Sequence, residues 1–318
     1  MAMRLRDFNF SNLYLEDPVQ TSRFRSPETG GRLLPPPAEV LPDLTVLYRA
    51  VSLAYQRNPK VMDFAVLHDD LLYRVAVIQD INHNNGVFAL RRGPKSVPTF
   101  AQCGIHPAII AQMLTLTSGL ILFIGPFSSG KTTAGSAFLS AFVTATGGLG
   151  MTLEDPPELP LSGDHGEGRI FQCQVAREDI DQEISNIMRT TFDILLISEI
   201  RTPRMAAEVI QNGSAGRLVV STLHSDSIHA GLARMGMMAA GATGSSDGAM
   251  RSSLGLLADS FQVAIEMAQI GTNQWGAVRY LMRDKDVPGK IRNGEFASLQ
   301  NSIQMQMNRL GQNVVMNK

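Results

Sequence analysis

The chain has 318 residues and 34.6 kDa, with 28 basic and 29 acidic side chains, so its formal charge is -1 and excludes a bulk attraction to nucleic acid or anionic lipid. Its 44% hydrophobic and 18% charged residues exclude a disordered chain, and its length predicts two domains. No apolar run reaches the ~18 residues of a transmembrane segment, the first residues lack a signal-peptide core, and two cysteines are too few for a disulfide framework, which together predict a soluble intracellular protein.

Residues 1–96 are predicted to form the smaller domain, of α+β class. The stretch 26–42 contains a glycine pair and three consecutive prolines, which predicts an exposed loop rather than a helix or a central strand. Apolar residues at helical spacing follow over 43–56, with Asp43 as the expected N-cap. A small sheet is then predicted from three short segments rich in Val, Phe and Tyr, at 62–67, 71–78 and 86–91.

Residues 97–318 are predicted to form the larger domain, after a linker around 93–98. Apolar strands alternate there with longer helical stretches, which is the pattern of a mostly parallel sheet with crossover helices. A C-terminal helix is expected over 296–310. The sequence therefore indicates an α/β domain that follows a smaller α+β domain.

The most specific motif is a glycine-rich loop at residues 125–133, which reads GPFSSGKTT and matches G-x-x-x-x-G-K-[ST]. An apolar strand precedes it at 120–124 and a predicted helix follows, as this motif requires. Glycines let backbone N–H groups converge on phosphate oxygens, and the helix N-terminus adds partial positive charge. An ordinary glycine turn with a surface lysine is the alternative. The predicted phosphate-binding residues are Gly125, Ser128, Ser129, Gly130, Lys131, Thr132 and Thr133.

Three further polar groups follow predicted strands. Glu154 lies in the segment MTLEDPPE, Glu199 follows the strand 193–197, and His224 follows the strand 218–223. The carboxyl ends of parallel strands line a ligand crevice, where a carboxylate can orient water or bind Mg²⁺. Taken singly, the acidic segment also fits a solvated turn, and the histidine fits a hydrogen-bonded loop residue.

In this order, four segments resemble the secretion and pilus ATPase superfamily, whose members power type II secretion, type IV pili and type IV secretion. The segments are GPFSSGKTT, MTLEDPPE, ILLISEIR and AGRLVVSTLHS. The N-terminal strands and the stretch AVRYLMRD at 277–284, similar to a C-terminal helix of pilus-retraction ATPases, extend the likeness. The resemblance implies a PAS-like N-terminal domain followed by a RecA-like P-loop domain. The missing paired-cysteine zinc motif favours the pilus-retraction or type IVB secretion and conjugation branch.

The resemblance also implies a role for each matching residue. Lys131 and Thr132 bind phosphate and Mg²⁺, Glu154 activates water, and Glu199 holds Mg²⁺ through its water shell. His224 senses the γ-phosphate. The remaining matches are arginines: Arg74 and Arg91, with Arg92 as the alternative to Arg91, close over the nucleotide, and Arg189 faces a neighbouring subunit.

Three positions depart from the family pattern. Arg217 stands where the family has the first of two histidines, and Ser198 and Thr202 replace a glycine and an acid beside Glu199. These departures leave the coupling role of position 217 open. They also support one alternative function, a nucleotide-binding assembly subunit that has lost hydrolysis.

The resemblance implies a homo-hexameric, ATP- and Mg²⁺-dependent motor in the cytoplasm. It is expected to attach to the inner membrane through a platform protein and to make no direct contact with nucleic acid. Another RecA-like ATPase that acts on nucleic acid is the remaining alternative, although the charge balance and 6% aromatic residues oppose it. The sequence leaves open whether the machine retracts or assembles a pilus, secretes protein or transfers DNA.

Overall fold

The structure is a computed structural model of the chain. It describes residues 4–26, 30–81, 86–176, 178–244, 246–271 and 274–316, without the side chains of 181 and 311–316. The chain forms two compact units: unit 1 contains Met1–Val97, Asp155–Pro160 and Gln174–Ala176, and unit 2 contains Pro98–Glu154, Leu161–Cys173 and Arg177–Lys318. Within the described residues, no helix is long and apolar enough to cross a membrane.

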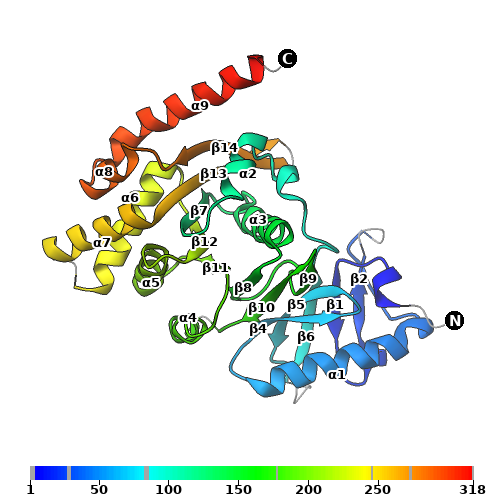
Figure 1. The fold of residues 1–318 in the computed structure, drawn as a ribbon. Helices are drawn as coiled ribbons and strands as arrows, with labels where there is room; N and C mark the ends of the chain where they lie inside the picture. The colour runs from blue at the N-terminus through cyan, green and yellow to red at the C-terminus, as the bar shows by residue number, and fades with distance from the viewer. Residues whose placement is uncertain are drawn as a thin grey trace. The chain divides into compact units, whose positions relative to one another are not determined.

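Unit 1 is an antiparallel six-stranded sheet with one long helix packed against it (Figure 1). The strand order is β3-β2-β1-β6-β5-β4. The strands are β1 (Asn12–Leu15), β2 (Arg23–Arg25), β3 (Leu33–Leu34), β4 (Asp63–His68), β5 (Leu71–Ile78) and β6 (Val87–Arg92), and the helix is α1 (Leu41–Arg57). Side chains of β5 alternate between buried and exposed from Tyr73 onward, and α1 buries Leu44, Leu47 and Val51 at helical spacing. The predicted α+β class is confirmed.

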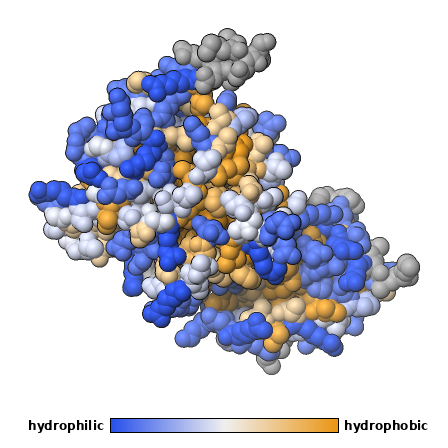
Figure 2. Space-filling model, viewed as in Figure 1, coloured by the Kyte–Doolittle hydropathy of each residue, from blue (hydrophilic) through white to orange (hydrophobic). Residues whose placement is uncertain are grey.

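Figure 2 shows apolar surface over α1. Its outward side chains Val46 and Leu53 are 53% and 55% exposed.

One prediction for the start of unit 1 is correct only in part, and another is wrong. Leu33–Leu34 forms an edge strand within the expected loop 26–42, and Val40 in a short 3-10 helix is fully buried; residues 27–29 lie outside the described part. Proline is tolerated beside an edge strand, which explains why three prolines did not prevent it. Asp43 is not an N-cap, because α1 begins at Leu41. Its carboxylate instead accepts the Leu5 N–H at 2.7 Å.

Unit 2 contains an eight-stranded sheet in the order β14-β13-β7-β12-β11-β8-β10-β9. Its strands are β7 (Gly119–Gly125), β8 (Leu149–Glu154), β9 (Gly163–His165), β10 (Gly168–Gln174), β11 (Ile194–Glu199), β12 (Leu218–His224), β13 (Phe261–Gly271) and β14 (Gln274–Met282). The pairs from β13 through β7, β12 and β11 to β8 are parallel. Every residue of β7 is buried, as expected for a strand covered on both faces. The predicted α/β class with a mostly parallel sheet is confirmed.

Unit 2 also contains the helices α2 (Pro107–Met113), α3 (Lys131–Thr146), α4 (Ile180–Ile187), α5 (Pro203–Ser214), α6 (Ile228–Ala242), α7 (Asp247–Ser260), α8 (Val287–Arg292) and α9 (Leu299–Met316). Along the chain, helices α3 to α7 lie between strands of this sheet, α2 precedes its first strand, and α8 and α9 follow its last strand. The predicted C-terminal helix is confirmed as α9, which buries Leu299 and Ile303.

The helix inferred at residues 277–284 is wrong. Residues up to Met282 belong to β14, which pairs antiparallel with β13, and the helix α8 follows only at Val287. The stretch around Trp275, Val278 and Tyr280 carries the aromatic and β-branched residues that pack well on a sheet.

Candidate nucleotide-binding site

The glycine-rich loop joins β7 to α3 at the end of a buried strand. Ser128 and Gly130 adopt positive φ angles of 58° and 84°. Gly130 is the N-cap of α3, and no side chain caps the helix there. The first turn of this 16-residue helix therefore begins at the glycine-rich loop, in a place where the helix dipole favours an anion.

The first glycine of the loop is required by close packing. A Cβ atom at Gly125 would overlap the carbonyl oxygen of Met267 and lie 2.6 Å from Ser129 Oγ. Ser129 is only 2% exposed, and its hydroxyl has no hydrogen-bond partner among the described residues. A buried hydroxyl without a partner is costly, so this loop fits a ligand that brings polar oxygen atoms.

Lys131 is the first residue of α3 and is 7% exposed. Its Nζ donates a 2.7 Å hydrogen bond to the carbonyl oxygen of Pro126, which holds the ammonium group over the loop. Thr132 and Thr133 follow in the same helical turn and are partly buried. The loop thus combines a buried cation, hydroxyl groups and a helix N-terminus.

Two carboxylates lie at the ends of neighbouring parallel strands. Glu154 ends β8, is 2% exposed, and its Oε1 accepts a 2.8 Å hydrogen bond from Gln172 Nε2 of β10. Glu199 ends β11, and its Oε2 accepts Arg201 Nε at 2.9 Å. Ser221 Oγ lies 2.9 Å from the Ile197 carbonyl oxygen and 2.8 Å from that of Ser198, where the register of β11 shifts.

His224 lies beside the glycine-rich loop. It ends β12, directly opposite Gly125 of β7, and its Nδ1 is 3.2 Å from the Gly125 carbonyl oxygen. Because that oxygen only accepts, Nδ1 carries the proton in this contact and Nε2 remains an acceptor in the neutral ring. The Phe127 ring packs against the imidazole with centroids 4.1 Å apart, and Arg234 donates to the His224 carbonyl oxygen at 2.7 Å.

The sheet order brings these groups to one edge. The adjacent parallel strands β7, β12, β11 and β8 end at Gly125, His224, Glu199 and Glu154 in turn. No group of three His, Cys, Asp or Glu side chains in the described residues forms a metal cage. The Thr132 hydroxyl and the Glu199 carboxylate are hard oxygen donors, which suit Mg²⁺ bound mainly through phosphate and water.

The predicted arginines belong to unit 1. Arg74 of β5 and Arg91 of β6 are directly opposite each other and share one face of the sheet. Arg74 donates to both oxygens of Asp63, at 3.1 and 2.6 Å, and lies 3.6 Å from the Glu158 carboxylate. The hydrogen bond to Asp63 raises the pKa of Arg74 above its usual value.

Arg91 and Arg92 differ in their contacts. Arg91 is exposed. Arg92 donates to the carbonyl oxygens of Phe8 at 3.0 Å and Arg6 at 2.7 Å, and its guanidinium lies 5.6 Å from the Phe10 ring centre. Arg92 thus fastens the N-terminal segment, whereas Arg91 faces solvent.

Two other arginines lie away from the phosphate loop. Arg217 immediately precedes β12, at the opposite end of the strand from His224. It donates to the Met188 carbonyl oxygen at 3.0 Å and stacks 4.8 Å from the Phe192 ring centre, so it fastens the segment after α4. Arg189, in that segment, is exposed.

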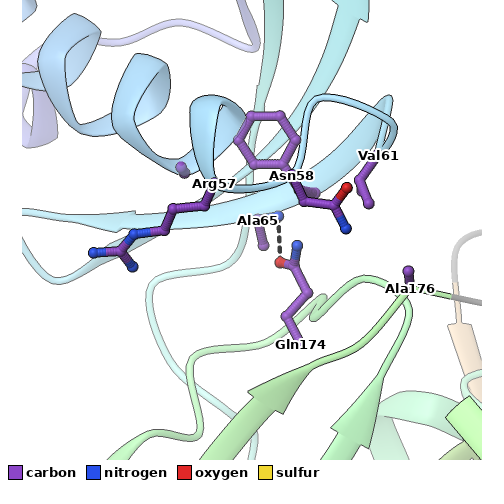
Figure 3. A pocket seen from close by; sticks show the side chains of 8 residues that line it. Arg57, Asn58, Val61, Ala65, Gln174 and Ala176 are labelled. Carbon is purple, nitrogen blue, oxygen red and sulfur yellow. Dashed lines mark hydrogen bonds between the residues drawn. The ribbon is translucent and has the colours of Figure 1, made fainter. Parts of the chain in front are cut away.

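A separate cavity of about 350 Å³ lies within unit 1 (Figure 3). The end of α1, the start of β4 and Gln174 line it, and Gln174 Oε1 accepts the Ala65 N–H at 2.7 Å. Arg57 is the one ionisable residue among those that line the cavity, which therefore contains no acid–base pair. The glycine-rich loop remains the candidate site.

Sequence reasoning missed two side chains that contact this site. Gln172 holds Glu154, and Trp275 of β14 packs on Gly130. Neither position belongs to a recognisable local motif. Each contact depends on which strands become neighbours.

Comparison with known proteins agrees with this geometry. A family model described as type II/IV secretion system protein matches residues 90–270, more than half of the chain. The putative type II secretion system protein E of Escherichia coli K12 is 35% identical over 129 residues, 40% of this chain and 25% of that protein. The type II secretion system protein E of Klebsiella pneumoniae is 34% identical over 138 residues, 42% of this chain and 26% of that protein. The chain thus spans about a quarter of the length of these curated relatives.

Solved structures show the same fold. The Legionella pneumophila ATPase DotB superposes with a TM-score of 0.70 and 16% identity, over 93% of this chain and 85% of that one. The pilus retraction motor PilT, solved with bound ADP, gives a TM-score of 0.70 and 20% identity, over 96% of this chain and 90% of that one. These similarities confirm the predicted RecA-like fold class.

Proposed function

Because this chain belongs to the type II/IV secretion system protein family, we propose that it hydrolyses ATP to ADP and phosphate and thereby powers a type IV pilus or a type IVB secretion or conjugation machine. The observation that carries this proposal is the shared sheet edge where the glycine-rich loop, His224, Glu199 and Glu154 lie together. A phosphate loop, two carboxylates and an imidazole are the groups that phosphoryl transfer to water uses.

In this proposal the loop binds the triphosphate. The N–H groups of the first turn of α3 and the Lys131 ammonium group neutralise phosphate charge, and Ser129 gains a partner for its buried hydroxyl. Thr132 and Glu199 hold Mg²⁺, with Glu199 acting through water. Bound Mg²⁺ supplies further positive charge to the phosphate oxygens.

Glu154 orients the attacking water in this scheme. Its carboxylate accepts the water proton as the oxygen bonds to the γ-phosphorus and the bond to the β-phosphate oxygen breaks. Gln172 fixes one carboxylate oxygen, so the group is held in place before nucleotide binds. His224, whose Nδ1 lies 3.2 Å from the Gly125 carbonyl oxygen, contacts the γ-phosphate side of the loop and donates a hydrogen bond there from Nε2 when that nitrogen also carries a proton.

We further propose that the motor is a cytoplasmic homo-hexamer, peripheral to the inner membrane and attached through a platform protein. Residues 1–96 and 97–318 are the moving domains, and the stretches Asp155–Pro160 and Gln174–Ala176 move with the first of them. Arg74 and Arg91 bring positive charge to the nucleotide, and Arg189 faces a neighbouring subunit. Charge neutralisation on ATP binding and its loss after hydrolysis then drive domain rotation. No direct contact with nucleic acid is part of this proposal.

Two substitutions test the chemistry. Lys131→Ala is expected to abolish ATP binding, whereas Glu154→Gln is expected to keep binding and to lower turnover by roughly 100-fold or more, since a general base is lost. Phosphate release and calorimetric ATP binding are the measurements.

Chelation of Mg²⁺ with EDTA is expected to stop turnover of the unchanged chain.

Glu167→Gln provides the matched control, because Glu167 is exposed in the turn between β9 and β10. It is expected to keep the full rate. A Glu154→Gln variant with a near-normal rate would remove Glu154 from its proposed role.

One observation favours a second candidate function. Glu199 is paired with Arg201, and the flanking Ser198 and Thr202 depart from the family pattern, so the Mg²⁺-side carboxylate is already partly neutralised. A nucleotide-binding assembly subunit without hydrolysis would show ATP binding to the unchanged chain but no phosphate release. The same two assays therefore separate the two candidates.

A further inference from the structure

The indole of Trp275 packs directly on the second glycine of the phosphate loop. A Cβ atom at Gly130 would overlap Cε3 and Cδ2 of Trp275 and lie 2.8 Å from its Cζ3. Gly130 is also the N-cap of α3, the residue from which the phosphate-facing helix starts. The ring therefore covers the point where the loop becomes helix, and it is the one tryptophan of the chain.

The strand pair β13–β14, to which Trp275 belongs, contacts the glycine-rich loop at Gly125 and at Gly130. Met267 of β13 brings its carbonyl oxygen against Gly125, and Trp275 of β14 brings its ring against Gly130. The β13–β14 pair therefore flanks the two ends of the loop. Its side chains can limit how far the loop moves.

Several contacts fix β14 in place. The Tyr280 hydroxyl accepts the His106 N–H at 3.2 Å, and a Cβ atom at Gly104 would lie 3.2 Å from the Gly276 Cα. Arg279 donates to the buried Glu266 of β13 at 2.6 Å. Trp275 thus projects from a strand that other contacts hold in place. Its contact with Gly130 can therefore restrain the loop.

We infer that Trp275 is a positioning residue of the phosphate loop: it holds Gly130 and the start of α3 in the conformation that receives phosphate, and its indole reports nucleotide binding. This inference rests on the proposed function, because the ligand it invokes is the ATP of that site. Trp275 acts through Gly130 and the backbone N–H groups, and it does not act on the reacting atoms.

The first test uses the tryptophan itself. Titration of the full chain with a non-hydrolysable ATP analogue and Mg²⁺ is expected to change the indole emission, because phosphate charge arrives next to the ring. The half-saturation point is expected to match the Kd measured by calorimetry. Lys131→Ala is the control and is expected to lose the emission change together with binding.

The second test separates positioning from simple packing. Trp275→Ala is expected to raise the Kd and KM for ATP roughly fivefold to tenfold, the effect of losing one aromatic contact that preorganises the loop, with kcat changed less than about twofold. Trp275→Phe is expected to recover most of the affinity. Ile270→Ala, which removes a 61% exposed apolar side chain from the same strand pair, is the matched control and is expected to change neither constant.

The outcomes distinguish this inference from the proposed function. If calorimetry detects no ATP binding to the unchanged chain, the proposed function fails. If ATP binds but the indole emission stays constant and Trp275→Ala keeps the Kd, the inference about Trp275 fails while the proposed function stands. A loss of thermal stability in Trp275→Ala with an unchanged Kd for ATP would show that the ring contributes packing and does not position the phosphate loop.

Discussion

Arg91 and Arg92 are sequence neighbours, and the strand β6 gives them different environments. Arg91 shares a face with Arg74 and is exposed, whereas the Arg92 guanidinium contacts two carbonyl oxygens of the N-terminal segment. The sequence alone left open which of them takes the role that the proposed function gives to an arginine. We propose Arg91, since the Arg92 guanidinium already contacts the N-terminal segment.

A pair of substitutions checks this difference. We expect Arg92→Ala to lower the free energy of unfolding by about 1–2 kcal/mol, because two carbonyl acceptors lose a charged donor. Arg91→Ala is expected to keep stability within about 0.5 kcal/mol and to lower ATP turnover roughly tenfold or more. Urea unfolding and phosphate release measure the two effects. The opposite assignment of effects would make Arg92 the functional arginine.

The residues of the candidate site were predictable to different degrees. Lys131, Glu154, Glu199 and His224 each belong to a local motif. Glu154, Glu199 and His224 end a strand and Lys131 follows one, and the sheet brings these strand ends together. Gln172 was not predictable, because its contact with Glu154 arises only when β10 lies beside β8. Short-range patterns identify a strand end, but they do not identify its lateral neighbour.

Among the elements, the β13–β14 pair shows where local patterns mislead. The segment 277–284 resembles a helix by its letters, yet its residues pair with β13 over most of its length. Antiparallel pairing supplies hydrogen bonds that a short isolated helix would lack. The parallel strands β7, β11 and β12 were predicted because each is a mainly apolar run. The parallel strand β13 was not predicted, because Gln and Glu interrupt its apolar residues. Strands β1 to β3 of unit 1 are too short to give a recognisable pattern.

The ion pair between Glu266 of β13 and Arg279 of β14 leads to a prediction about stability. Glu266 is 5% exposed, accepts Arg279 at 2.6 Å and also accepts the Ile228 N–H at 3.2 Å. We expect Arg279→Ala to lower the free energy of unfolding by about 2 kcal/mol, since a buried carboxylate loses its cation.

The control is Arg292→Ala, which breaks the exposed pair between Arg292 and Asp259 and is expected to cost about 0–1 kcal/mol. The midpoint of urea unfolding, followed by circular dichroism, compares the two variants. Equal losses would mean that burial of Glu266 adds nothing to the pair.

For the molecule as a whole, the proposed hexamer makes a mass prediction. Light scattering of the full chain with a slowly hydrolysed ATP analogue is expected to give the mass of six copies of the 34.6 kDa chain. Lys131→Ala with the same analogue is the control for assembly driven by nucleotide. A monomer under every nucleotide condition would contradict the ring.

The two units are not consecutive pieces of chain. Unit 1 takes in Asp155–Pro160, which begins one residue after Glu154, and Gln174–Ala176. A recombinant fragment that stops at Val97 would lose Glu158 from Arg74 and the Gln174 amide from the Ala65 N–H. A fragment that starts at Pro98 would contain Asp155–Pro160 and Gln174–Ala176 without the strands of unit 1 against which they fold. We therefore expect that a single cut between Val97 and Pro98 separates stretches of chain that fold together in unit 1.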